Sequence, residues 1–178
     1  AQRDLAIAYS YAGLLEEAER YASGALKFKA NDPQQAYAPA HKILGDVAAR
    51  RGRFDDAIAA YGRALELASE RFKPLIRVSI ANAYTSAGRA ADALAQLDTL
   101  KPADAAKLGA FLTRSRANAL LAAGQPHEAG ALFRRVADDT QAADATYQRL
   151  WAFEGLGRVE LARGDRAAAL AAYLETVK

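Results

Sequence analysis

The sequence of 178 residues contains no cysteine, no methionine, one tryptophan and only two histidines. The absence of cysteine excludes disulfide bonds, thiolate chemistry and cysteine-ligated zinc. His41 and His127 lie far apart along the chain and form no i, i+4 pair, so they provide no zinc-binding motif either. The chain also lacks a glycine-rich phosphate loop, a nucleophile elbow and a kinase signature. We therefore expect a non-catalytic protein with no metal and no cofactor.

Long hydrophobic runs and a large excess of one charge are missing as well. No apolar run approaches the roughly 18 residues that a membrane span needs, and no signal peptide is recognisable. The 24 basic and 21 acidic residues are interleaved and leave a net charge of +3. A nucleic-acid-binding protein usually concentrates its basic residues on one face. We expect neither a membrane span nor a nucleic-acid partner.

The chain does have abundant alanine, at about a quarter of its residues, and five glycines with matching surroundings. These anchor glycines, 36 to 40 residues apart, are Gly13, Gly52, Gly88, Gly124 and Gly164. An alanine follows each glycine by five residues: Ala18, Ala57, Ala93, Ala129 and Ala169. A small residue precedes each by seven: Ala6, Gly45, Ala81, Ala117 and Gly157. The residue nine after is large in four of the five: Tyr61, Leu97, Phe133 and Tyr173. Internal repeats of this period indicate a solenoid.

The spacing has a direct physical interpretation as a helix–turn–helix unit. Each anchor glycine follows a helical stretch and supplies the left-handed residue that ends it. The two small residues let the paired helices cross closely, and the large residue fills the groove toward the neighbouring unit. This predicts an all-α fold of ten helices in five hairpins, at about 2–12 and 15–30, 34–51 and 54–70, 73–87 and 90–100, 103–123 and 126–138, and 141–163 and 166–177.

These columns resemble the tetratricopeptide repeat family over essentially the whole chain. The leucine–glycine pairs at 44–45 and 156–157 match the family's pair, and Tyr9 and Tyr84 match its following tyrosine. The units are longer than the usual period of about 34 residues, and Arg116 replaces an apolar residue. The resemblance implies an α-solenoid forming a right-handed superhelix, as a single array over 1–178 with units at about 1–31, 34–71, 73–101, 102–139 and 141–178.

In arrays of this family the first helix of each hairpin lines a concave groove. Residues six, nine and ten before the anchor glycine point into it. The resemblance therefore implies a partner-binding groove, for which we select Lys42, Asp46, Ser79, Asn82, Arg114, Ser115, Asn118, Trp151 and Arg158. The carboxylate clamp with which some members hold acidic C-terminal tails is missing, because only Lys42 fits it in the second to fourth units.

Two columns within this groove have alternative interpretations. Asn82 and Asn118 occupy the same place in successive units, and their amides suit the backbone of an extended peptide. Alternatively, these polar residues only solvate a concave face. Thirteen residues before their glycines stand Leu75, Phe111 and Trp151, which either offer pockets to a partner's apolar side chains or pack on the preceding hairpin.

The resemblance implies an adaptor that binds an extended peptide or helix of a partner protein in the groove. The alternative is a structural scaffold or oligomerisation segment of a larger bacterial assembly or regulator, with no groove ligand. The Ala- and Arg-rich composition is typical of bacterial members, so we expect a bacterial source, with cytoplasm and periplasm both open. The chain lacks an initiating methionine and capping helices, which predicts either a longer parent protein or self-association through terminal repeats.

Overall fold

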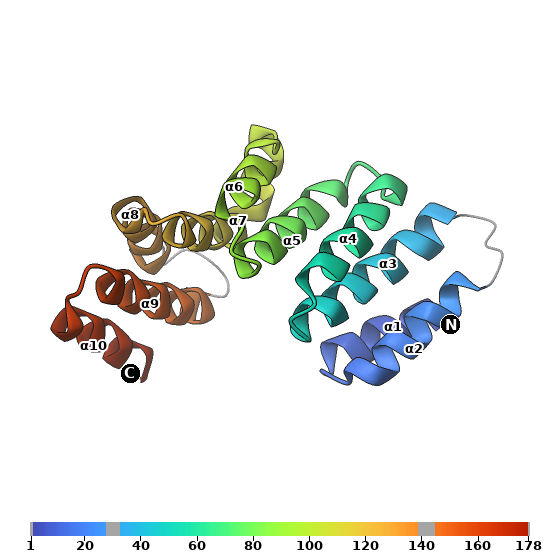
Figure 1. Cartoon of the computed structure of the whole chain (residues 1–178), viewed down its shortest axis with the longest axis horizontal. Coiled ribbons are helices and arrows are strands. Elements are labelled where there is room, and N and C mark those ends of the chain that lie inside the picture. Colours follow the sequence, from blue (N-terminus) through green and yellow to red (C-terminus); the bar gives the residue numbers. More distant parts are fainter. Residues whose placement is uncertain (1, 28–32, 139–144, 178) are drawn as a thin grey trace. The chain divides into compact units, whose positions relative to one another are not determined.

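The computed structural model describes residues 2–27, 33–138 and 145–177, and these ranges contain ten α-helices and no strand (Figure 1). The helices are α1 (Gln2–Tyr11), α2 (Leu15–Leu26), α3 (Pro33–Arg50), α4 (Phe54–Leu67), α5 (Lys73–Ser86), α6 (Ala90–Asp98), α7 (Pro102–Ala122), α8 (Pro126–Asp138), α9 (Ala145–Ala162) and α10 (Arg166–Leu174). A short 3-10 helix, Glu175–Val177, follows α10. The all-α fold of helical hairpins is confirmed.

Helix ends differ from the prediction at a few places. The fourth helix ends at Leu67 rather than at 70, because Ala68 has extended backbone angles (φ −72°, ψ 143°). The seventh helix was predicted without interruption, but Gly109 has non-helical angles (φ 50°, ψ −129°) and divides α7 into two helical stretches. The predicted helical residues 28–30 and 141–144 lie outside the described ranges.

All five anchor glycines adopt the backbone conformation that the repeat predicts. Each has a positive φ, between 73° and 84°. At each turn the residue after the glycine donates its N–H to a carbonyl five residues back, as Arg53 does to Ala48 at 2.9 Å. The glycine itself donates three residues back, as Gly52 does to Ala49 at 3.0 Å. This is the Schellman arrangement, which satisfies the last carbonyls of a helix and reverses the chain.

By its contacts the chain divides into two compact units, an N-terminal unit of residues 1–89 and a C-terminal unit of residues 90–178. In the N-terminal unit α1 packs on α2 and α3 packs on α4, while α1 also contacts α3 and α4 contacts α5. In the C-terminal unit α7 packs on α8 and α9 on α10, and α7 also contacts α9. The single array over 1–178 stays a prediction.

The small residues lie at the helix crossings, as predicted. Ala6 and Ala18 belong to one buried cluster, and Ala117 and Ala129 to another, each pair coming from the two helices of one hairpin. All four are 0% exposed. The paired helices therefore meet through side chains no larger than a methyl group.

The large residues nine after the glycines pack in two directions rather than in one. A side chain built on Gly45 of α3 would lie 2.5 Å from ring carbons of Tyr61 on α4, in the same hairpin. Gly157 and Tyr173 form the same pair between α9 and α10. Tyr61 also packs in a cluster with Ile76 of the next hairpin, so the predicted contact with the neighbouring unit is only half of its role.

Replacing Gly52 by alanine tests the turn geometry. We expect Gly52→Ala to lower the free energy of unfolding by about 1–2 kcal/mol, because alanine resists a φ of 74°. Gly62→Ala is the matched control, since Gly62 lies inside α4 and an added methyl group would meet no atom within 4 Å. It should raise stability by about 0.5–1 kcal/mol. Urea titration followed by circular dichroism measures both, and shifts of equal sign would contradict the interpretation.

Candidate functional site

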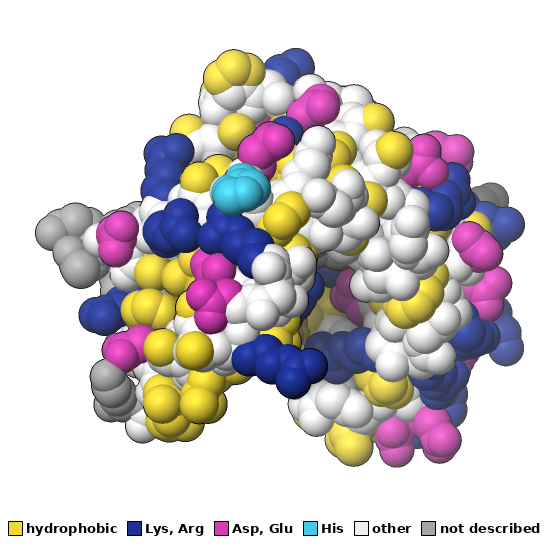
Figure 2. All heavy atoms as spheres, turned by 60° about the vertical axis from the view of Figure 1, so that its left-hand side comes forward, with side chains coloured by type: hydrophobic (Ala, Val, Ile, Leu, Met, Phe, Trp, Pro, Cys, Tyr) yellow, Lys and Arg dark blue, Asp and Glu magenta, His cyan; other side chains and the backbone are white. Residues whose placement is uncertain are grey.

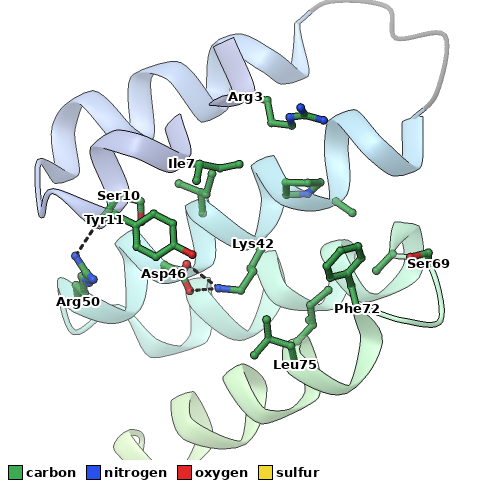
Figure 3. A pocket seen from close by; sticks show the side chains of 15 residues that line it. Arg3, Ile7, Ser10, Tyr11, Lys42, Asp46, Arg50, Ser69, Phe72 and Leu75 are labelled. Atoms are coloured by element: carbon green, nitrogen blue, oxygen red, sulfur yellow. Dashed lines mark hydrogen bonds and ion pairs between the residues drawn. The ribbon is translucent and has the colours of Figure 1, made fainter. Parts of the chain in front are cut away.

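The N-terminal unit contains an open cleft of about 690 Å³, lined by α1, α3 and the start of α5 (Figure 3). These are the first helices of their predicted hairpins, so the cleft lies on the face for which a groove was expected. Its floor is apolar and includes the buried Ile43 and Ile76. Phe72 and Leu75 also line it, and their side chains remain 56% and 38% exposed. The cleft therefore offers apolar surface to a ligand.

Two of the predicted site residues, Lys42 and Asp46, lie in this cleft and form an ion pair. Lys42 Nζ is 2.8 Å from Asp46 Oδ2, one helical turn further along α3. The hydroxyl of Tyr61 on α4 donates a 2.8 Å hydrogen bond to Asp46 Oδ1. Burial, and then the charge of Asp46, raise the pKa of Tyr61 far above its ordinary value, so this hydroxyl keeps its proton. The negative charge of the Asp46 carboxylate is thus stabilised by Lys42 and by the Tyr61 hydroxyl.

The sequence-based selection missed Arg3 and Ile7, which line the cleft from α1. Arg3 stands ten residues before Gly13, as Lys42 stands ten before its own glycine, and Ile7 stands six before. The same register extended to the first hairpin would have found both.

Arg50 was also missed, although it lines the cleft at the end of α3. Its guanidinium donates a 3.2 Å hydrogen bond to the carbonyl of Ser10 on α1. Nothing in the repeat register indicates that Arg50 reaches across to α1. This contact depends on how two neighbouring hairpins pack.

Ser79 and Asn82 lie on α5, half-buried, and neither lines the cleft. The Ser79 hydroxyl donates to the carbonyl of Leu75 in its own helix at 3.3 Å. Asn82 belongs to the N-terminal unit and Asn118 to the C-terminal unit. The peptide-binding ladder between these two asparagines stays a prediction.

In the C-terminal unit Asn118 and Arg158 meet. Arg158 of α9 donates a 3.2 Å hydrogen bond to Oδ1 of Asn118 on α7. Glu154, one turn before Arg158, lies 3.8 Å from its guanidinium. Asn118 and Arg158 both stand six residues before an anchor glycine. Equivalent positions of two neighbouring first helices therefore lie side by side in this unit.

Ser115 does not present its hydroxyl as expected, because it is only 2% exposed. The equivalent Ile43 is 4% exposed. A side chain built on Gly155, which stands at the same place before Gly164, would collide with the ring of Phe133 from the preceding hairpin. In these three hairpins the residue nine before the glycine therefore serves helix packing, whereas Ser79, at the same place on α5, is only half-buried.

A smaller pocket of about 300 Å³ lies in the C-terminal unit and is lined by α7, α8 and α9. Phe111, Arg114 and Trp151 line it. The Arg114 guanidinium carbon is 4.0 Å from the centroid of the Trp151 ring and 5.7 Å from that of Phe111, which is a cation–π arrangement. Burial lowers the pKa of Arg114, against the opposing effect of the Glu154 charge. Trp151 remains 41% exposed, so the pocket has an open aromatic wall.

Other kinds of site find little support in the described ranges. No group of three or more His, Asp and Glu side chains there is placed to hold a metal ion. None of the helices described is long and apolar enough to cross a membrane. Figure 2 shows basic and acidic side chains interspersed over the face that it presents, rather than one continuous basic surface.

Comparison with known proteins agrees with this geometry. Residues 38–71 match the family model of the tetratricopeptide repeat. The chain is similar to two crystal structures of nearly identical TPR-like repeats from a putative kinesin light chain of Podosopora anserina, one of them a point variant. The variant's structure gives a TM-score of 0.67 at 19% identity, and the other 0.64 at 21%. Both alignments cover 99% of this chain and 91% of the other. No curated protein matches.

The helical hairpins, their Schellman turns and the match over 38–71 define a helical-repeat protein. Residues 38–71 match a tetratricopeptide repeat, and the fold of the whole chain is similar to that of TPR-like repeats. Repeats of this family generally mediate protein–protein interaction, and the fold is typically a non-catalytic interaction module.

The hydrogen bond between Tyr61 and Asp46 can be tested by removing one hydroxyl. We expect Tyr61→Phe to lower the free energy of unfolding by about 1–3 kcal/mol, because a partly buried carboxylate loses a donor. Tyr84→Phe is the control, since Tyr84 is also partly buried but has no hydrogen bond to Asp46. Equal stability of the two variants in urea titration would contradict the assigned role.

The stacking of Arg114 on Trp151 can be followed by fluorescence, because Trp151 is the only tryptophan. Arg114→Ala should uncover one face of the indole, shift its emission to longer wavelength and increase its quenching by acrylamide. Arg116→Ala is a control on the same helix, where Arg116 pairs with Asp98 instead. If acrylamide quenches the Trp151 fluorescence of both variants equally, the stacked arrangement does not hold in solution.

Proposed function

We propose that the chain binds an extended segment or short helix of a partner protein on the faces formed by the first helices of its hairpins. The observation that carries this proposal is the cleft of the N-terminal unit, lined by α1, α3 and the start of α5. It combines exposed apolar side chains with a few charged groups. Ligand sites in proteins generally have this composition.

The exposed apolar residues of the cleft support binding rather than packing. Phe72 and Leu75 contribute large side chains that keep about half and about a third of their surface open to solvent. Covering an apolar side chain stabilises a complex by about 1.5–3 kcal/mol when the side chain was fully exposed before. Two such residues beside each other supply a useful part of the affinity of a peptide complex.

The smaller pocket supports a second contact point within the C-terminal unit. Trp151 is large, rigid and half-exposed, and Trp and Arg are enriched among the residues that dominate binding energy at interfaces. Arg114 holds the indole ring in place from one side. In the proposed function a partner's apolar side chain enters beside Trp151, while Asn118 and Arg158 form hydrogen bonds with its polar groups.

A second candidate function, a scaffold that assembles through its end helices, is favoured by one specific observation. Large apolar side chains stay exposed on α1 and the turn that follows it, and on α9 and α10, among them Tyr11, Leu14, Leu161, Leu170 and Leu174. Figure 2 shows exposed hydrophobic side chains gathered on part of the face it presents. In this function the repeats associate with copies of the chain and leave the cleft without a ligand.

A selection from a display library of random dodecapeptides tests the proposed function. We expect enriched peptides that bind the chain and that bind at least about tenfold more weakly to Phe72→Ala/Leu75→Ala, because about 1.4 kcal/mol corresponds to tenfold. Both residues are exposed, so the double variant should stay folded. Leu170→Ala/Leu174→Ala removes two exposed apolar side chains that belong to the C-terminal unit and do not line the cleft, and it is the matched control.

Two results would contradict the proposed function. One is the failure of the library to yield any peptide that depends on Phe72 and Leu75. The other is enrichment of peptides that the control variant loses equally. Concentration-dependent assembly in analytical ultracentrifugation, together with either result, would favour the scaffold instead.

A further inference from the structure

The cleft of the N-terminal unit has two unlike walls. Phe72, Leu75 and Ile76 form an apolar wall at the start of α5. The other wall, from α1 and α3, carries the charged groups. Figure 3 shows Phe72 and Leu75 on one side of the cleft, with the Lys42–Asp46 pair between them and α1. A ligand that fills the cleft therefore meets different chemistry on its two faces.

The charged wall is positive. The described residues that line the cleft include three cations, Arg3, Lys42 and Arg50, and one carboxylate, Asp46. Asp46 accepts from Lys42 and from Tyr61, so Arg3 and Arg50 are the lining cations not paired with this carboxylate. Arg3 pairs with Asp4, an exposed neighbour outside the cleft lining. A guanidinium has five N–H groups and can donate to more than one carboxylate.

The size of the cleft favours a short extended ligand. A volume of about 690 Å³ lies within the usual range of about 300–1,000 Å³ for sites that hold small ligands. The cleft therefore accommodates only a few residues of a ligand. A helix of that length is not stable by itself, because isolated helices shorter than about 12 residues are only marginally stable in water. An extended chain directs successive side chains to opposite faces without needing a helix.

We infer that this cleft binds an extended protein segment in which acidic and apolar residues alternate. The inference rests on the proposed function and specifies its ligand. The apolar side chains lie against Phe72 and Leu75, and the carboxylates on the other face lie against Arg3, Lys42 and Arg50. A segment with the same residues in two blocks cannot place both kinds against their walls at once.

Three labelled octapeptides test this inference by fluorescence anisotropy. The first alternates Glu and Leu, the second carries the same residues as a Glu block followed by a Leu block, and the third alternates Lys and Leu. We expect the first to bind at least about tenfold more tightly than the other two, a difference of about 1.4 kcal/mol per tenfold. Its affinity should fall when the ionic strength rises from about 0.05 M to about 0.5 M, because salt screens the ion pairs.

Protein variants locate the effect in the cleft. Arg3→Gln/Lys42→Gln should weaken binding of the first peptide about tenfold or more. Arg20→Gln/Arg63→Gln removes the same charge from the same unit at residues that do not line the cleft, and it should leave the affinity within about twofold after salt correction. Circular dichroism confirms that each variant stays folded.

The outcomes separate this inference from the proposed function. If the Lys–Leu peptide or the block peptide binds as tightly as the Glu–Leu peptide, the inference is overturned. If that binding is also lost in Phe72→Ala/Leu75→Ala, the proposed function stands with a different ligand chemistry. If none of the three binds, the inference fails, and the display selection alone decides the proposed function.

Discussion

Close approach of paired helices is the constraint on which the rest of this structure depends. Ala6 against Ala18 and Ala117 against Ala129 bring two backbones together at fully buried positions. Where glycine replaces alanine, as at Gly45 and Gly157, the space is used by an aromatic ring from the second helix. The hairpin is thus defined by where large side chains are absent as much as by where they are present.

This constraint also determines which residues remain open to a partner. The small residues of the first helix pack at the crossing, and Ile43, Ser115 and Gly155, each nine residues before an anchor glycine, are buried. The faces left over carry Lys42 and Asp46 in one unit and Asn118 and Arg158 in the other. The cleft and the smaller pocket lie on these remaining faces, so recognition and packing occupy different sides of the same helix.

Most of the fold was predictable because its determinants are local in sequence. A glycine with φ near 75° and small residues at fixed distances from it specify a hairpin without knowledge of the rest of the chain. The interruption of α7 at Gly109 was not predictable in this way, since one glycine inside a helical pattern does not by itself predict a break in the helix. For the candidate site, the distance of a residue from its anchor glycine indicated which helix carries it. The contacts that each side chain makes could not be predicted. Nothing in the sequence pairs Arg50 with Ser10 or places Arg114 over Trp151, because those contacts join different hairpins.

The uniformity of the five turns has a consequence for how such a chain diverges. Because the hydrogen bonds at each turn involve only backbone atoms, they depend on one glycine and on no other side chain. Residues at the open places, such as Lys42 or Arg158, do not take part in those bonds. Substitutions at these places change the groups that a partner meets and leave the turns unchanged. New binding preferences can therefore arise while the chain still folds.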